Sequence, residues 1–145
     1  MTAQPLSAED RLDIMGVIAS YSRLLDAHDI DRWLQLWRPD AVLDSMSGSV
    51  TGHDALRVWI QRLFDHRKVG HDPALLVHFI GLPVIEGDRE RATAQTYTII
   101  FDYADDGHVQ VPLLGRYDDV LSRYDGQWRF ERRFIAGVLS GPDRG

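Results

Sequence analysis

Two residues of this sequence combine a side chain capable of acid–base chemistry with apolar surroundings. Asp26 directly follows two leucines in the stretch YSRLLDAHDIDRW, where a helix should be completing its buried face. His78 lies within the apolar run LVHFI, with Leu76 and Ile80 as its neighbours on the same face of a strand. An imidazole there needs a hydrogen-bond partner, since an unsatisfied buried polar group costs roughly 1–3 kcal/mol. When a carboxylate bonds one ring nitrogen, the other nitrogen is free to act as a base.

Both residues also have a plain structural interpretation. His78 is alternatively a core or surface histidine whose hydrogen bonds are satisfied. Asp26 falls more than a quarter-turn from the centre of the helix face that contains Ile14, Ile18 and Tyr21, so periodicity places it at the edge of that face. A solvated acid fits this position equally well. A carboxylate near a helix C-terminus opposes the helix dipole, which suggests some compensating use.

The elements that must position these residues begin with three predicted helices. Ser7 and Asp10 form a capping-box-like start. Apolar residues then recur at helical spacing, at Ile14, Val17, Ile18, Tyr21, Leu24, Leu25 and His28. A second short helix carries Ile30, Trp33, Leu34 and Trp37, and Pro39 ends it because its ring cannot continue a helix. A candidate strand follows at 41–46. After it comes a third predicted helix, whose inward-facing residues are Ala55, Leu56, Trp59, Ile60, Leu63 and Phe64.

The second half of the sequence predicts strands. Four segments rich in β-branched and aromatic residues, 74–86, 91–104, 108–124 and 127–140, are separated by short turn sequences. Asp125-Gly126 predicts a hairpin, because glycine tolerates the positive φ that such turns require. Helices followed by an antiparallel meander indicate an α+β fold, with three N-terminal helices on one curved sheet enclosing a conical, apolar cavity.

Composition limits the classes of function. The 145 residues predict a single domain, 1–145, with an ordered core of about 8–139. A net charge of −6 disfavours nucleic acid as a partner. The absence of cysteine excludes disulfides and thiolate metal sites. The N-terminus lacks the pattern of a secretory signal and no apolar run approaches the ~20 residues of a membrane span, so we expect a cytoplasmic protein without a membrane partner.

Other common chemistries lack their sequence signatures. The histidines His53, His66 and His71 match no metal-binding spacing, so we expect neither a metal nor a cofactor. The glycines Gly48 and Gly52 are isolated and form no phosphate-binding loop, and no Gly-x-Ser-x-Gly motif is present. Hydride transfer, phosphoryl transfer and acyl-serine chemistry are therefore disfavoured.

Several motifs, taken in order, resemble a known family. They are Tyr21 with Asp26, LWRPDAVLD at 36–44, Gly52 before the third helix, His78, the hairpin GRYDDVLSRYDGQW at 115–128, and Arg133. Together they resemble the SnoaL-like branch of the nuclear transport factor 2-like superfamily. Its cone-shaped α+β domain hosts cofactor-free enzymes that include scytalone dehydratase, bile acid dehydratase, hexachlorocyclohexane dehydrochlorinase, ketosteroid isomerase and polyketide cyclases.

The resemblance implies catalytic roles for four residues. In such relatives an acid near the end of the first helix pairs with a histidine on the first long strand, so Asp26 would orient His78. Tyr21 would hold a substrate oxygen, and Arg133 would bind developing negative charge. The alternatives are core packing for Tyr21 and a surface Arg–Glu pair for Arg133. Strand alternation puts Arg129, Glu131 and Arg133 on one sheet face and Arg132 on the other.

The resulting hypothesis is a cofactor-free lyase, of the dehydratase or elimination type, acting on a small hydrophobic or cyclic molecule. Aromatic side chains would line its cavity, drawn from Trp33, Trp37, Trp59, Tyr97, Phe101 and Tyr117. The same Asp–His pair also fits an isomerase or polyketide cyclase. A non-catalytic ligand-binding or oligomerising module is the alternative from a different class. The outer face of the sheet has to be covered, so we expect a homodimer or homotrimer.

Overall fold

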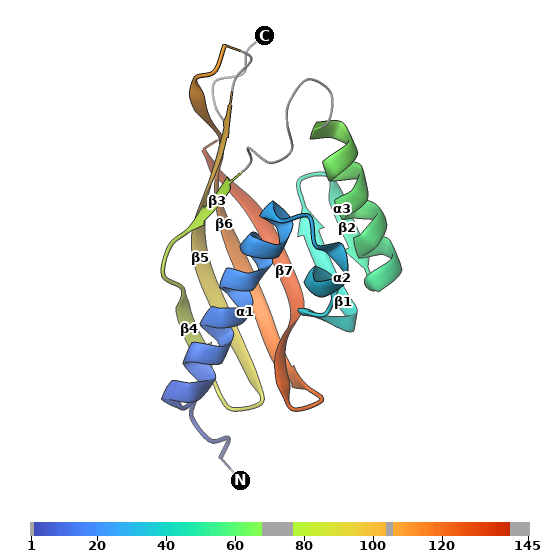
Figure 1. The fold of residues 1–145 in the computed structure, drawn as a ribbon. Coiled ribbons are helices and arrows are strands. Elements are labelled where there is room, and N and C mark those ends of the chain that lie inside the picture. The colour runs from blue at the N-terminus through green and yellow to red at the C-terminus, as the bar shows by residue number, and fades with distance from the viewer. Residues whose placement is uncertain (1, 68–76, 104–105, 140–145) are drawn as a thin grey trace.

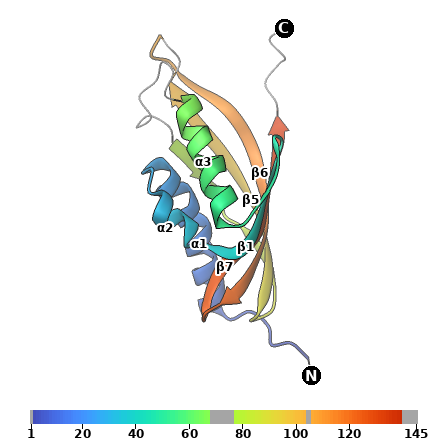
Figure 2. The ribbon, with the colours of Figure 1, turned by 90° about the vertical axis from the view of Figure 1, so that its right-hand side faces the viewer.

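All three helices lie on one face of a single curved sheet (Figures 1 and 2). The structure is a computed structural model that describes residues 2–67, 77–103 and 106–139. The elements in chain order are α1 (Ala8–Asp26), α2 (Ile30–Leu34), β1 (Trp37–Ser45), β2 (Gly48–Thr51), α3 (His53–Arg67), β3 (Val77–Ile80), β4 (Val84–Gly87), β5 (Arg91–Tyr103), β6 (Val109–Tyr124) and β7 (Gln127–Leu139).

The sheet has the strand order β2-β1-β7-β6-β5-β3, and β4 also pairs with β5. Among the described strands, β1 and β7 run parallel and the other pairs are antiparallel. The α+β class and the curved sheet with N-terminal helices are thus confirmed, with one parallel pair in place of a purely antiparallel sheet. This pair joins the strand that follows α2 to the last strand of the meander.

Helix α1 begins and ends as its sequence predicts, and its end positions Asp26. The Ser7 side chain accepts a hydrogen bond from the Asp10 backbone N–H, and the Asp10 carboxylate accepts one from the Ser7 N–H, which completes the capping box. At the other end His28 takes a positive φ of 57° and its N–H donates to the Leu25 carbonyl at 3.0 Å. The helix therefore terminates with Asp26 as its last residue.

The predicted second helix is shorter than expected. It ends at Leu34, whereas Trp37 and Pro39 belong to β1. The meander provides the physical reason, because the Phe130 N–H of β7 donates to the Leu36 carbonyl at 2.8 Å and draws the chain into the sheet. The proline is tolerated because the β1–β7 register is irregular between Trp37 and Val42, where a ladder hydrogen bond is not required.

The four predicted strand segments of the second half are found in the structure, and one of them is divided into two strands. The described part of segment 74–86 forms two strands, β3 and β4, on either side of residues 81–83, and both pair with β5. Residues 74–76 of that segment lie outside the described part of the chain. The hairpin at Asp125-Gly126 is confirmed, since both residues have positive φ values of 49° and 73°.

A β-bulge changes which residues of β7 point inward. Phe130 pairs with Leu121 and Arg132 pairs with Val120, so Glu131 is an extra residue on β7. The bulge moves Arg133 onto the inner face, where it is fully buried, and leaves Glu131 to bind Arg91 at 3.1 Å. The prediction that Glu131 and Arg133 share a face was therefore wrong. Simple alternation cannot anticipate an inserted residue.

The core between the helices and the sheet is strongly aromatic. Tyr21 lies 5.6 Å, centroid to centroid, from both Trp33 and Tyr117, and Trp37 lies 4.9 Å from Phe130. These rings are nearly or completely buried, and burying an aromatic side chain contributes roughly 1.5–3 kcal/mol. This cluster fixes the position of α1 on the sheet. None of the helices in the described ranges has the length and apolar character needed to cross a membrane.

Candidate active site

The carboxylate of Asp26 and the imidazole of His78 form a two-point contact between α1 and β3. The Asp26 Oδ1 lies 2.6 Å from His78 Nδ1, and Oδ2 accepts a hydrogen bond from the His78 backbone N–H at 3.0 Å. Both side chains are largely buried, with 6% of His78 and 14% of Asp26 exposed. The pair is 52 residues apart in the chain, and the end of α1 brings it together.

The position of β3 in the sheet explains the backbone contact. Within the strand order, β3 is the terminal strand and pairs with β5 alone. A strand at the edge of a sheet has N–H groups without a strand partner. Asp26 accepts the hydrogen bond from the N–H of His78 at this edge. The carboxylate is thereby fixed at both oxygens, and it holds the imidazole ring in one orientation.

The contact selects one tautomer of His78. A carboxylate only accepts hydrogen bonds, so Nδ1 must carry the proton that it shares with Asp26. In the neutral imidazole the remaining nitrogen, Nε2, then has a free lone pair. His78 is also one of the residues that line a cavity that is partly open to the surface. The arrangement can accept a proton at Nε2 and stabilise the resulting imidazolium through the carboxylate.

The cavity lies between α1, α3 and the inner face of the sheet, and its volume is about 250 Å³. Its wall is predominantly apolar, and the polar side chains on it belong to two tyrosines, two serines and the histidine. The lining residues are Tyr21, Leu25, Ser45, Met46, Ser47, Trp59, Leu63, His78, Ile100, Leu113, Tyr117, Ile135 and Gly137. A base in such a cavity meets little competition from water, which suits the abstraction of a proton from carbon.

Two tyrosines face the cavity beside His78. Burial raises the pKa of Tyr21, and although Arg133 opposes this shift, the pKa stays well above its usual value. Burial likewise raises the pKa of Tyr117. Both hydroxyls therefore remain protonated at neutral pH. Each can donate a hydrogen bond to an oxygen of a bound molecule.

Arg133 lies behind these tyrosines rather than on the cavity wall. Its guanidinium donates two hydrogen bonds to Asp119, at 2.7 and 2.8 Å, and its carbon lies 4.0 Å and 3.9 Å from the ring centres of Tyr21 and Tyr117. Burial alone would lower the pKa of Arg133, but the charge and hydrogen bonds of Asp119 raise it, so the guanidinium stays charged. The structure thus makes Arg133 a support for both tyrosine rings through cation–π contacts.

The six aromatic residues predicted to line the cavity separate into three groups. Trp59 and Tyr117 do line it. Trp33 and Trp37 are completely buried in the core and do not reach it. Tyr97 and Phe101 are likewise absent from the lining, and Tyr97 is 60% exposed on the outer sheet face. Tyr97 on β5 points to the outer face of the sheet, whereas Tyr117 on the paired strand β6 points to the inner face. Alternation along a single strand does not say which of its two faces is the inner one.

Asp119 is the main site residue that the sequence analysis missed. Asp118 and Asp119 are adjacent, so alternation requires one of them to point inward. The inward arginine on β7 needs an acidic partner, and Arg133 pairs with Asp119 across the β6–β7 ladder. That pair of signals could have identified Asp119. The contributions of Ser45, Met46 and Ser47 depend on the β1–β2 turn and carry no comparable sequence signal.

Of the other histidines considered for metal binding, His53 has a described side chain, and it lies apart from this site. The His53 Nε2 atom lies 3.0 Å from the Trp37 carbonyl, with which it forms a hydrogen bond. His71 and the side chain of His66 lie outside the described part of the chain. Within the described ranges, no three His, Asp or Glu side chains come together as a metal site.

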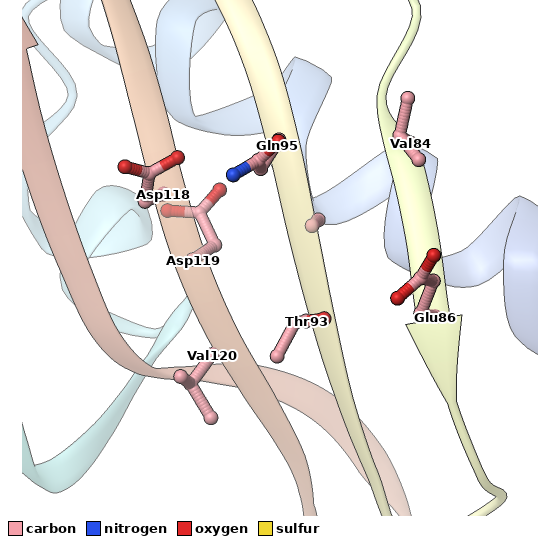
Figure 3. Close-up of a pocket in the computed structure, with 8 residues that line it drawn as sticks. Val84, Glu86, Thr93, Gln95, Asp118, Asp119 and Val120 are labelled. Atoms are coloured by element: carbon pink, nitrogen blue, oxygen red, sulfur yellow. The ribbon is translucent and has the colours of Figure 1, made fainter.

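A second hollow lies on the opposite face of the sheet from α1 (Figure 3). Its walls come from β4, β5 and β6, with Glu86, Gln95 and Asp118 as polar groups of the outer face. Asp118 is already bound by two nitrogens of Arg116, both at 2.9 Å. The hollow has no histidine on its wall. The cavity around His78 is therefore the better candidate for acid–base chemistry.

Comparison with known proteins identifies the class of this domain. Residues 6–134 match the SnoaL-like domain family, and the chain belongs to that family. No curated protein matches the sequence.

Three solved structures from Novosphingobium aromaticivorans share the fold. An NTF2-like protein with a cystatin-like fold is 22% identical, covering 92% of this chain and 85% of its own, with a TM-score of 0.78. A candidate scytalone dehydratase is 19% identical, with coverages of 90% and 85% and a TM-score of 0.74. The β subunit of a candidate aromatic-ring-hydroxylating dioxygenase is 20% identical, with coverages of 90% and 90% and a TM-score of 0.72. At these identities the likeness concerns the fold.

Proposed function

We propose that this protein is a lyase of the dehydratase or elimination type that acts on a small hydrophobic or cyclic molecule. The observation that carries the proposal is the two-point contact of Asp26 with His78 at the wall of an apolar cavity. A histidine held in one tautomer by a carboxylate is the arrangement expected of a general base. The SnoaL-like fold also occurs in the candidate scytalone dehydratase.

In the proposed reaction, His78 Nε2 removes a proton from the carbon next to a carbonyl group. The electron pair of that C–H bond forms a new carbon–carbon double bond as the neighbouring C–O or C–halogen bond breaks. The departing group takes the electron pair of the broken bond and leaves either as halide or, when it is a hydroxyl, as water after it receives the proton held by the His78 imidazolium. Asp26 stabilises the imidazolium, and the hydroxyls of Tyr21 and Tyr117 donate hydrogen bonds to the carbonyl oxygen.

Arg133 acts in this proposal as a positioning residue. It contacts the rings of Tyr21 and Tyr117, and its charge lies directly behind them. A cation there favours the build-up of negative charge on an oxygen bound by the two hydroxyls. Asp119 holds the guanidinium in place through two hydrogen bonds.

The test is incubation of the protein in deuterated water with cyclic ketones that carry a hydroxyl or halogen at the β-carbon. We expect loss of water or halide, detected by mass spectrometry, and no such loss with the His78→Gln variant. Deuterium incorporation without elimination would instead favour an isomerase or cyclase. A protein that binds these compounds and neither exchanges nor eliminates would overturn the enzymatic proposal in favour of a ligand-binding module.

The oligomeric state stays a prediction. The outer sheet face carries exposed apolar side chains that include Phe79, Tyr97 and Phe134. Such a face supports association of two or three copies of the chain. Light scattering of the purified protein distinguishes a monomer from the expected homodimer or homotrimer.

A further inference from the structure

A groove along α3 borders the cavity and shares part of its lining. Its volume is about 640 Å³, and it is lined by Ser47, Val50, Asp54, Ala55, Val58, Trp59, Arg62 and Leu63. We refer to it as the α3 groove. Three of these residues, Ser47, Trp59 and Leu63, also line the cavity around His78. The two spaces are therefore neighbours, with these three side chains as their common border between α3 and the β1–β2 turn.

The size of the cavity limits what it can hold by itself. Its 250 Å³ is below the roughly 300–1,000 Å³ of pockets that enclose a whole drug-sized ligand. One or two rings would fill it. A substituent on such a ring, pointing away from His78 toward α3, would pass Trp59 and enter the α3 groove.

The cation next to this passage is Arg62. It follows Trp59 by three positions, so the two side chains lie on the same side of α3, and both line the groove. Arg62 has no hydrogen-bond or ion-pair partner among the residues that the structure describes. By contrast, Arg57 of the same helix binds the carboxylate of Asp31 at 2.7 Å. Arg62 is therefore available to a ligand, whereas Arg57 is already paired.

The acidic residue of the groove, Asp54, lies away from Trp59 and Arg62. Asp54 is eight residues before Arg62, which corresponds to about 12 Å along the axis of an α-helix. An anionic substituent near Trp59 would thus meet Arg62 before it met Asp54. Guanidinium groups bind carboxylates through two parallel hydrogen bonds, which favours a planar anion over a neutral polar group.

We propose that the ligand of the cavity is a ring compound with an anionic substituent, such as a carboxylate, that leaves the cavity past Trp59 and pairs with Arg62 in the α3 groove. This inference rests on the proposed function, because it takes the cavity around His78 as the substrate site. It adds the substrate class, namely cyclic acids. The uncharged part of such a molecule would occupy the apolar space in front of His78.

The experiment compares two probes of nearly equal shape, naphthoate and naphthamide, in heteronuclear NMR titrations of the full-length protein. The side-chain N–H signal of Trp59 reports where the probe binds. In the wild-type protein we expect naphthoate to bind more tightly than naphthamide and to shift the Trp59 signal. The Arg62→Met substitution should weaken naphthoate binding about fivefold and leave naphthamide binding unchanged. Arg62→Lys should restore part of the preference.

Arg57→Met is the matched control, because it removes an exposed arginine from the same helix outside the groove. It should change the binding of neither probe. Equal binding of the two probes to the wild-type protein, a failure of both to bind, or an equal response of Arg57→Met and Arg62→Met would overturn the inference. These are binding measurements, so an absence of elimination activity would contradict the proposed function and leave a preference that depends on Arg62 intact.

Discussion

Helix α1 carries a carboxylate at each end, Asp10 buried and Asp26 largely buried, and the two have different surroundings. Asp10, in the first turn, accepts hydrogen bonds from the backbone and side chain of Ser7, from Arg123 and from the indole of Trp128. Asp26, the last residue of the helix, forms two hydrogen bonds within the described part of the chain, and both are with His78. One acid is surrounded by donors from three parts of the chain, and the other is paired with a single residue at a cavity wall.

The helix dipole makes this difference informative. A negative charge is favoured at a helix N-terminus and disfavoured at a C-terminus. Asp10 therefore contributes to helix stability, and the hydrogen bonds from Ser7 hold the pKa of its carboxyl far below the usual value. Asp26 lies at the unfavourable end and gains nothing from the dipole. Its contact with a histidine that faces the cavity supports a role in chemistry rather than in folding.

The largest effect is expected when the proposed base is removed. The His78→Gln substitution should lower kcat for elimination by about 10²–10⁴-fold, because general base catalysis is typically worth that much. The Asp10→Asn variant, assayed beside it, should retain the kcat of the wild type. Steady-state kinetics with the substrate found in the screen measures both. Similar kcat values for His78→Gln and the wild type would remove His78 from the mechanism.

A somewhat smaller effect is expected when Asp26 is neutralised. In Asp26→Asn the amide group can donate to Nδ1, which moves the proton of the imidazole to Nε2 and removes the free base. We expect kcat to fall about 10²-fold, in line with the loss of a partner that orients a catalytic group. The nitrogen chemical shifts of His78 report the tautomer directly. A ring that keeps its proton on Nδ1 in this variant would contradict the orienting role.

The contrast between the two acids also separates what the sequence predicts from what it does not. The capping box of Ser7 and Asp10 is local, with two residues between its partners, and the sequence predicts it fully. The place of Asp26 at the edge of a helix face is equally local. Its pairing with His78 spans 52 residues and came from the resemblance to a family, since periodicity says nothing about which strand meets the end of a helix.

The bulge at Glu131 marks a similar limit. Strand alternation assigns residues to two faces, but one inserted residue reverses the assignment for everything after it. Arg133 therefore lies inside, beside Asp119, while its neighbours on β7 bind Arg91 and Asp44 at the surface. Which residue bulges depends on the register between β6 and β7. That register is a property of two strands together.

The stability of the protein at low pH should depend on Asp10. Because the pKa of its carboxyl is lower in the folded state, the unfolded chain binds the proton more readily, and stability is lost as the pH falls below about 4. The Asp10→Asn variant should have a lower Tm at pH 7 and a smaller further loss between pH 5 and about pH 3. Thermal unfolding followed by circular dichroism across this range tests it. Parallel pH profiles for wild type and variant would contradict the assignment.

The smallest effect is expected from the cap itself. The Ser7→Ala substitution removes the hydroxyl that accepts the hydrogen bond from the Asp10 N–H and donates to the Asp10 carboxylate. Loss of an N-cap side chain typically costs about 1 kcal/mol, which corresponds to a decrease in Tm of about 3 °C for a domain of this size. Elimination activity should not change, because Ser7 lies at the far end of α1 from His78. A Ser7→Ala protein with normal stability but reduced kcat would mean that the two ends of α1 are coupled, and the separation of a folding acid from a chemical acid would then be wrong.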